Sequence, residues 1–220
     1  TLTPPQPSVR MKLKAWLEGA YVSGGSMSTS LQSAGPIPSV SPYSDGRDGG
    51  FVPASATDWV QVELRETPSG SPAAVQSFFL KSDGSLIEPD GSTDLTVPGA
   101  GAGGYYVVLK HRNHCAVMSA DTVGLDDVHA AEYDFSDGAG RYYGSGGAKE
   151  LESGVWGMWA GDVNQDGNVT TTDYTSWYNS ARLGESGYRA TDINLDGVVT
   201  TSDYTMWYNN ARLGAASQVP

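Results

Sequence analysis

Two twelve-residue stretches near the end of the chain decide its fold: DVNQDGNVTTTD at 162–173 and DINLDGVVTTSD at 192–203. They are parts of a longer duplication, because residues 161–190 align with 191–220 without a gap and 17 of the 30 aligned positions are identical. Both copies continue into YTxWYNxARLG. A fixed period of this kind indicates two copies of one supersecondary unit.

Each stretch has the oxygen pattern of an EF-hand calcium loop, with side chains at positions 1, 3, 5 and 12, a main-chain carbonyl at position 7 and Gly at position 6. Ca²⁺ prefers oxygen ligands at about 2.3 to 2.6 Å, and short Asp and Asn side chains on alternate residues can converge on such an ion. The sequence therefore predicts two Ca²⁺ per chain. The predicted ligands are Asp162, Asn164, Asp166, Asn168 and Asp173 in the first loop and Asp192, Asn194, Asp196, Val198 and Asp203 in the second.

A helix is expected after each loop but not before it. Apolar residues recur at i, i+3, i+4 and i+7 from Tyr174 and from Tyr204, so each helix carries one aromatic stripe. The N-caps are expected at Thr172 and Ser202, and a Gly ends each helix. The two stripes should pack face to face about a pseudo-two-fold axis, and the valines at position 8 suit pairing between the two loops.

Position 12 is Asp in both loops, where the EF-hand has Glu. With the loop-then-helix order, this Asp makes residues 159–214 resemble a tandem type I dockerin, also called an F-hand pair. The resemblance implies calcium binding and docking to a cohesin-like partner, although the ions could serve folding alone. Partner contacts implied by the family are Thr171, Thr172, Arg182, Thr201, Ser202 and Arg212.

The region upstream shows strand signals at short spacing. Val60, Val62 and Leu64 alternate with polar residues, and further strand-like runs are separated by turn sequences such as Ser-Asp-Gly and Pro-Asp-Gly. The chain is thus predicted to be mainly β with a small α part, beginning with an immunoglobulin-like β-sandwich. The expected divisions are a Pro-rich linker at 1–9, the sandwich at 10–158, the calcium-binding pair at 159–214 and a tail at 215–220.

Composition narrows the classes of function. The net charge of −12 argues against nucleic-acid or anionic membrane partners, which need a basic field. No apolar run approaches the roughly 20 residues of a membrane span. No nucleophile elbow, phosphate loop or zinc-protease motif is present, so a non-catalytic module is expected.

A second metal site is considered at His111-Arg-Asn-His114. If Arg112 and Asn113 form a two-residue turn, the two imidazoles face each other across a hairpin with Cβ atoms about 5 Å apart. Such a pair could hold a transition metal. An ordinary structural turn explains the same pattern, so both readings stay open here.

The upstream region also resembles an uncharacterised β module that adjoins dockerin-like repeats in large secreted bacterial proteins. Three stretches carry this likeness, at 59–65, 105–114 and 157–164. It implies a bacterial secreted or cell-surface setting, with a cohesin-like protein or adjacent domains of a parent protein as partners. The alternative function is a carbohydrate-binding module of a secreted polysaccharide-degrading protein, for which Trp16 is a candidate because it falls on the polar face of its strand.

Overall fold

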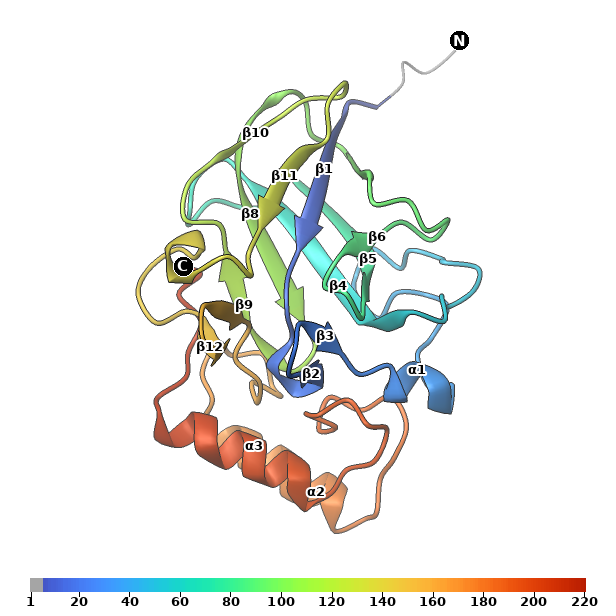
Figure 1. The fold of residues 1–220 in the computed structure, drawn as a ribbon, viewed down its shortest axis with the longest axis vertical. Helices are drawn as coiled ribbons and strands as arrows, with labels where there is room; N and C mark the ends of the chain where they lie inside the picture. The colour runs from blue at the N-terminus through green and yellow to red at the C-terminus, as the bar shows by residue number, and fades with distance from the viewer. Residues whose placement is uncertain (1–5) are drawn as a thin grey trace.

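The computed structural model describes residues 6–220. Two β-sheets face each other to form a sandwich, and two helices lie beneath one end of it (Figure 1). Within the described residues, no helix is long and apolar enough to cross a membrane. The prediction of a mainly β chain with a small α part is confirmed.

The smaller sheet has three strands in the order β11-β1-β7, and β1 runs parallel to β11 but antiparallel to β7. The larger sheet has the order β10-β8-β4-β5-β6, with β9 also paired to β8. The strands of these sheets are β1 Ser8–Lys14, β4 Ala56–Arg65, β5 Ala74–Lys81, β6 Leu86–Ile87, β7 Leu95–Pro98, β8 Gly103–His111, β9 His114–Met118, β10 Val123–Leu125 and β11 Ala131–Asp134.

Short elements fill the edges and ends. Two small hairpins are formed by β2 with β3 and by β12 with β13. Single helical turns occur at η1, α1 and η2, and the C-terminal repeats supply the two longer helices. Their bounds are η1 Glu18–Ala20, β2 Tyr21–Val22, β3 Ser26–Met27, α1 Ser30–Ala34, η2 Ala139–Arg141, β12 Lys149–Glu152, β13 Val155–Gly157, α2 Thr171–Ala181 and α3 Thr201–Arg212.

The apolar residues of β4 lie in the core, as the alternating pattern predicts, but the strand is buried on both faces rather than half-buried. Val60, Val62 and Leu64 are buried in the main core, to which Val9, Met11 and Leu13 of β1 also belong. Their polar neighbours are also buried, and Glu63 forms ion pairs with Arg65 and with Lys110. The buried charge of Glu63 is therefore paired, as burial of charge requires.

Strand β1 begins at Ser8, inside the predicted linker at 1–9, and residues 1–5 of that linker lie outside the described range. The strand ends at Lys14, before it reaches Trp16. Trp16 is consequently buried at 3% exposure in the main core. The expectation that Trp16 lies on the polar face is wrong, because the chain leaves the sheet before reaching it.

Candidate functional site: the paired loops

The two loops have the same backbone conformation. Gln165 and Leu195, at position 4, have positive φ angles of 58° and 60°, and the Gly at position 6 also has positive φ in both loops. In the first loop the Asp166 amide donates to Asn164 Oδ1 at 3.0 Å, and in the second the Asp196 amide donates to Asn194 Oδ1 at 3.1 Å. A left-handed conformation at a non-Gly residue is uncommon, so its presence at the same position in both copies marks a shared, constrained loop.

The Asp at position 12 ties the end of each loop to its beginning. Asp173 is fully buried; its Oδ1 accepts from the amides of Val163 and Asn164, and its Oδ2 accepts from the Thr170 amide at 2.8 Å. Asp203 makes the same three contacts in the second loop. A side chain that belongs to the helix thereby fixes the geometry of the loop.

The helix N-caps are Thr170 and Thr200, so the expected caps at Thr172 and Ser202 are wrong by two residues. Each cap side chain accepts from the amide two residues later, while the Asp at position 12 bonds back to the cap amide, which completes a capping box. That reciprocal bond selects the cap among several neighbouring Ser and Thr residues.

The first residue of each loop is a buried carboxylate. Asp162 is 2% exposed, and its Oδ1 has no hydrogen-bond partner. Burial, together with the charge of Asp173, raises the pKa of Asp162 to about 7. Burial also raises the pKa of Asp192 to about 7, although the Gly197 amide and the Arg112 guanidinium oppose this shift. A cation bound beside these two carboxyl groups would favour their ionised forms and lower their pKa values.

The oxygen-rich loops fit a hard cation such as Ca²⁺. Among residues 6–220, no group of three or more His, Cys, Asp or Glu side chains is arranged to hold a metal by itself. The predicted ligand set is of a different kind, because it combines carboxylates with an Asn side chain and the main-chain carbonyl of Asn168 or Val198. The unpartnered oxygen of Asp162 is the structural feature that fits an ion best.

Helices α2 and α3 pack against each other through their aromatic stripes. The Trp177 indole donates to the Thr200 carbonyl at 2.9 Å, and the Trp207 indole donates to the Thr170 carbonyl at 2.8 Å. The ring of Tyr174 lies 5.1 Å from that of Trp207, and Tyr204 lies at the same distance from Trp177. These reciprocal contacts agree with the predicted pseudo-two-fold relation.

The loops do not pair with each other, contrary to expectation. The Val169 amide donates to the Ala215 carbonyl at 3.0 Å, beyond α3, and the Val199 amide donates to the Glu185 carbonyl at 3.1 Å, beyond α2. Each loop is therefore closed by the segment that follows the other repeat's helix. Residues 215–220, predicted to be a tail, thus take part in the structure through Ala215.

The residues predicted to touch a partner all have exposed side chains. They lie at the starts and at the C-terminal ends of the two helices, at positions related by the pseudo-symmetry, namely Thr171, Thr172, Arg182, Thr201, Ser202 and Arg212. Leu183 and Leu213 next to the arginines are also exposed, at 67% and 68%. A symmetric surface that combines hydroxyls, apolar groups and basic groups remains open to solvent.

The two histidines do face each other across the β8–β9 turn, as the hairpin predicts. Their Nδ1 atoms are 2.9 Å apart; His111 Nε2 lies 3.1 Å from Asp58 Oδ2, and His114 Nε2 accepts from the Gly19 amide at 3.0 Å. All four ring nitrogens are therefore in hydrogen-bonding contacts with protein. This arrangement supports the structural turn rather than the second metal site.

The same turn joins the sandwich to both loops. The Asn113 side chain donates to the carbonyls of Ala190 and Asp192, and the Gln165 side chain donates to the His111 carbonyl. Arg112 stacks 4.3 Å from the ring of Tyr188. Sequence reasoning missed this role of Asn113 and Tyr188, because no local pattern reveals contacts between residues about 77 positions apart.

A buried charged network supports the turn. Asp58 is fully buried and accepts from Arg112 Nε at 2.9 Å and from the Tyr188 hydroxyl at 2.6 Å. Burial acts to raise the pKa of Asp58, but Arg112, His111 and Tyr188 outweigh it and lower the pKa to about 2. The carboxylate is therefore held ionised at the centre of the junction.

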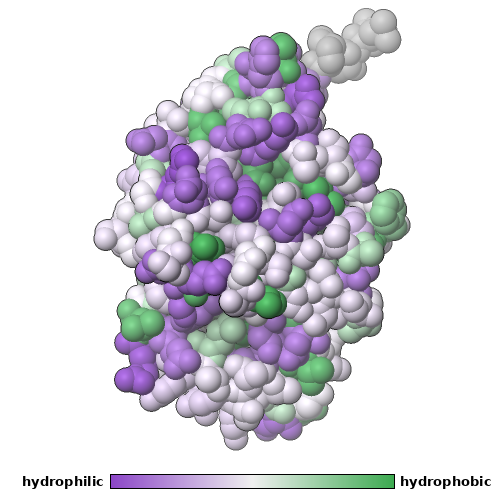
Figure 2. All heavy atoms as spheres, viewed as in Figure 1, coloured by the Kyte–Doolittle hydropathy of each residue, from purple (hydrophilic) through white to green (hydrophobic). Residues whose placement is uncertain are grey.

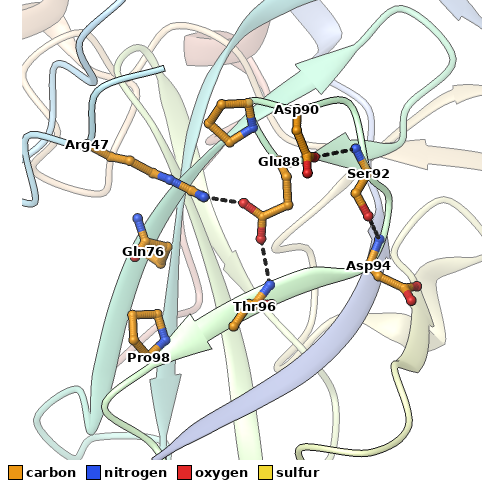
Figure 3. A pocket seen from close by; sticks show the side chains of 9 residues that line it. Arg47, Gln76, Glu88, Asp90, Ser92, Asp94, Thr96 and Pro98 are labelled. Atoms are coloured by element: carbon orange, nitrogen blue, oxygen red, sulfur yellow. Dashed lines mark hydrogen bonds and ion pairs between the residues drawn. The ribbon is translucent and has the colours of Figure 1, made fainter. Parts of the chain in front are cut away.

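The structure gives limited support to a sugar site. One groove, of about 530 Å³, lies on the sandwich and is lined mainly by polar and charged residues (Figure 3). None of its lining residues is aromatic: Arg47, Gln76, Glu88, Pro89, Asp90, Ser92, Asp94, Thr96 and Pro98. All six tryptophans of the chain are buried or half-buried. The face shown in Figure 2 has apolar residues only in scattered spots.

We expect calcium binding to release protons near pH 6 to 7. In the metal-free fold the pKa values of Asp162 and Asp192 are raised from 3.8 to about 7, so the folded state binds more protons than the unfolded state between those values. The metal-free fold should lose stability as pH rises through this window, and Ca²⁺ should bind more tightly. Calorimetry in buffers of different ionisation enthalpy measures the released protons. An equal heat in all buffers would contradict the expectation.

Comparisons with known proteins agree with this geometry. Residues 160–211 match the family model of the dockerin type I domain. No curated protein matches the chain. Two solved type II cohesin–X–dockerin complexes from Acetivibrio cellulolyticus, an N-terminal and a C-terminal interface mutant, show some likeness.

The first complex is 16% identical over 92% of this chain and 94% of that chain, with a TM-score of 0.43. The second is 17% identical over 96% and 97%, with a TM-score of 0.44. Likenesses of this size do not establish a shared fold. The family match is confined to the C-terminal part, where residues 160–211, with the loop motif and the paired helices, are similar to a type I dockerin domain.

Proposed function

We propose that this chain is a non-catalytic, calcium-dependent docking module of a bacterial secreted or cell-surface protein. The observation that carries the proposal is the symmetric exposure of Thr171 with Thr172 and of Thr201 with Ser202 on two helices that pack against each other. A partner can bind to this surface only while the loops hold the first turns of both helices in place.

Calcium is proposed to do that holding. Each loop would bind one Ca²⁺ through the side chains at positions 1, 3, 5 and 12 and the carbonyl at position 7. The ligands are Asp162, Asn164, Asp166, Asn168 and Asp173, and Asp192, Asn194, Asp196, Val198 and Asp203. Three carboxylates per loop give a charge of −3, which the ion would reduce to −1, so bound calcium removes much of the repulsion within each loop.

The proposed partner is a cohesin-like protein, the kind of partner named for the two similar complexes. Dockerin domains are interaction modules, and the polar rim with exposed leucines suits a protein surface. The sandwich would serve as a rigid support, because the β8–β9 turn joins it to both loops. Adjacent domains of a parent protein are the other partners that this surface could meet.

A binding assay with matched variants tests the proposal. The pseudo-two-fold symmetry of the helix pair would let a partner bind in either of two orientations. Replacing Thr171 and Thr172 by Ala should therefore weaken binding to a cognate cohesin by about a factor of two, because the orientation that uses Thr201 and Ser202 remains. Replacing Thr201 and Ser202 by Ala should weaken binding by a similar factor. Replacing all four should weaken binding about a hundredfold or more, because both modes are lost.

A panel of cohesins in calcium buffer, measured by surface plasmon resonance, gives the affinities. Thr175→Ala with Thr205→Ala is the matched control, since both residues are exposed one turn further along the helices. If no cohesin of the panel binds while the calcium-loaded chain is folded, the docking proposal fails.

A further inference from the structure

One polar cluster joins α3 to the sandwich, away from the loops. Lys149 Nζ, on β12, lies 2.9 Å from Asn210 Oδ1, on α3. Glu18 in η1 contacts both partners: its Oε1 accepts from Lys149 Nζ, and its Oε2 accepts from Asn210 Nδ2 at 2.6 Å. An amine, a carboxamide and a carboxylate thus touch one another pairwise.

The surrounding protein fixes the three groups. Asn210 is fully buried, and its Nδ2 also donates to the Ala160 carbonyl at 2.8 Å. The Ala160 amide donates to Glu18 Oε2 at 2.9 Å. Lys149 Nζ lies 5.1 Å from the ring of Trp159, and the side chains of Lys149 and Glu18 are 24% and 9% exposed. Water has little access to the site.

The dockerin pattern does not require this cluster. The position equivalent to Asn210 in the first repeat is Ser180, and the reciprocal indole bonds between the helices involve neither residue. Asn210 therefore serves the contact between α3 and the sandwich. A single ion pair would suffice for that contact, whereas a buried carboxamide held against an amine suits a reaction between them.

We propose that Lys149 and Asn210 join in an intramolecular isopeptide bond, with Glu18 as the proton carrier. Glu18 takes a proton from the Lys149 ammonium through Oε1, and the freed amine attacks Cγ of Asn210, one bond from the oxygen that it already contacts. Glu18 then gives the proton to Nδ2 through Oε2, and the C–N bond to Nδ2 breaks. Nδ2 leaves as ammonia, which takes the remaining extra proton from the Lys149 nitrogen and departs as ammonium.

The step balances without an oxidant or a cofactor. A Lys ammonium and an Asn carboxamide become one secondary amide and one ammonium ion, and Glu18 returns to its carboxylate form. Amide exchange of this kind is slow between free groups in water. Holding the two groups in contact supplies effective molarities of about 10⁵ M or more, which accelerates the reaction. The bond has to form only once in each chain.

The bond would tie the last helix of the dockerin domain to the β12–β13 hairpin of the sandwich. A force or a chelator acting on the loops could then open them without separating α3 from its support. This inference does not depend on the proposed partner or on calcium, because the experiment that tests it measures only whether the covalent bond has formed.

Intact mass spectrometry of the folded full chain tests it. We expect a mass about 17 Da below the sequence mass, from loss of one ammonia. Tandem spectra of a digest should show the peptide containing Lys149 linked to the peptide containing Asn210. Lys149→Arg and Glu18→Gln should each restore the full mass, and both keep a side chain that can hydrogen-bond in place.

Two results would overturn the proposal. One is the full sequence mass in folded wild-type chain after prolonged incubation. The other is a loss of 17 Da confined to a single peptide, since an Asn that cyclises on its own backbone also loses ammonia. Circular dichroism of the wild-type chain confirms that the fold was present during the measurement.

Discussion

Chelation of calcium is expected to unfold the dockerin domain while the β-sandwich stays folded. Each loop carries three Asp side chains, and without metal burial raises the pKa values of Asp162 and Asp192 to about 7, so their ionised forms are unfavourable there. Saturation at a hundred times the Kd stabilises the folded state by about 2.7 kcal/mol per site. Loss of both ions should therefore remove more stabilising free energy than two short helices can supply by themselves, and the domain should unfold.

When calcium is removed, the first loop should open before the second. Leu195 of the second loop is fully buried in the main core, and Asn113 donates to the Asp192 carbonyl. Gln165, the equivalent of Leu195 in the first loop, is exposed. We expect hydrogen exchange in EDTA to accelerate first at 162–173 and then at 192–203, and least in β4 and β8.

The matched variants Asp162→Ala and Asp192→Ala separate the two sites. Each should remove one ion, and Asp192→Ala should lower the melting temperature more, because its loop is continuous with the sandwich core. Circular dichroism in the aromatic region reports the packing of Trp177 and Trp207. Unchanged exchange and unchanged aromatic signal in EDTA would contradict this account of the domain.

Replacing Asp58 by Ala should produce the largest loss of stability within the sandwich. The substitution leaves the buried Arg112 guanidinium without its carboxylate and removes the acceptor of the Tyr188 hydroxyl and the contact of His111. Removing one partner of a buried ion pair costs about 3 to 5 kcal/mol. Urea unfolding in calcium buffer measures the change.

Asp83→Ala is the control, because Asp83 pairs with Lys81 at the surface and such pairs contribute about 1 kcal/mol or less. Equal midpoints for the two variants would show that the junction is not held by this network. The pKa of Asp58 is lowered from 3.8 to about 2, so its contribution to stability is complete above pH 3.8 and is lost as pH falls toward 2.

The repeats were the most predictable part of the molecule, because periodic spacing fixes both helices and the Gly positions. Gly184 and Gly214 end the helices with positive φ, as expected. The N-caps were missed because Thr170, Thr171 and Thr172 all suit a cap, and only the bond from Asp173 selects the first. The crossed closure at Ala215 was missed because a single backbone bridge leaves no pattern of alternation.

The sandwich followed from the alternation in β4, whereas the position predicted for Trp16 was wrong because β1 had already ended. The junction lay beyond local reasoning. Asp58, Asn113 and Tyr188 meet only after the hairpin, the second loop and β4 come together. The cluster of Glu18, Lys149 and Asn210 is hidden in the same way, since its members are 131 and 61 positions apart.

Calorimetric titration of calcium into the chelator-treated, dialysed full chain tests the central claim most directly. We predict two Ca²⁺ bound per chain, and one for either Asp162→Ala or Asp192→Ala. Sites of this kind in extracellular modules have Kd values of about 10⁻⁴ to 10⁻³ M, so the titration needs concentrated protein. A folded chain that takes up no calcium under these conditions would contradict the account.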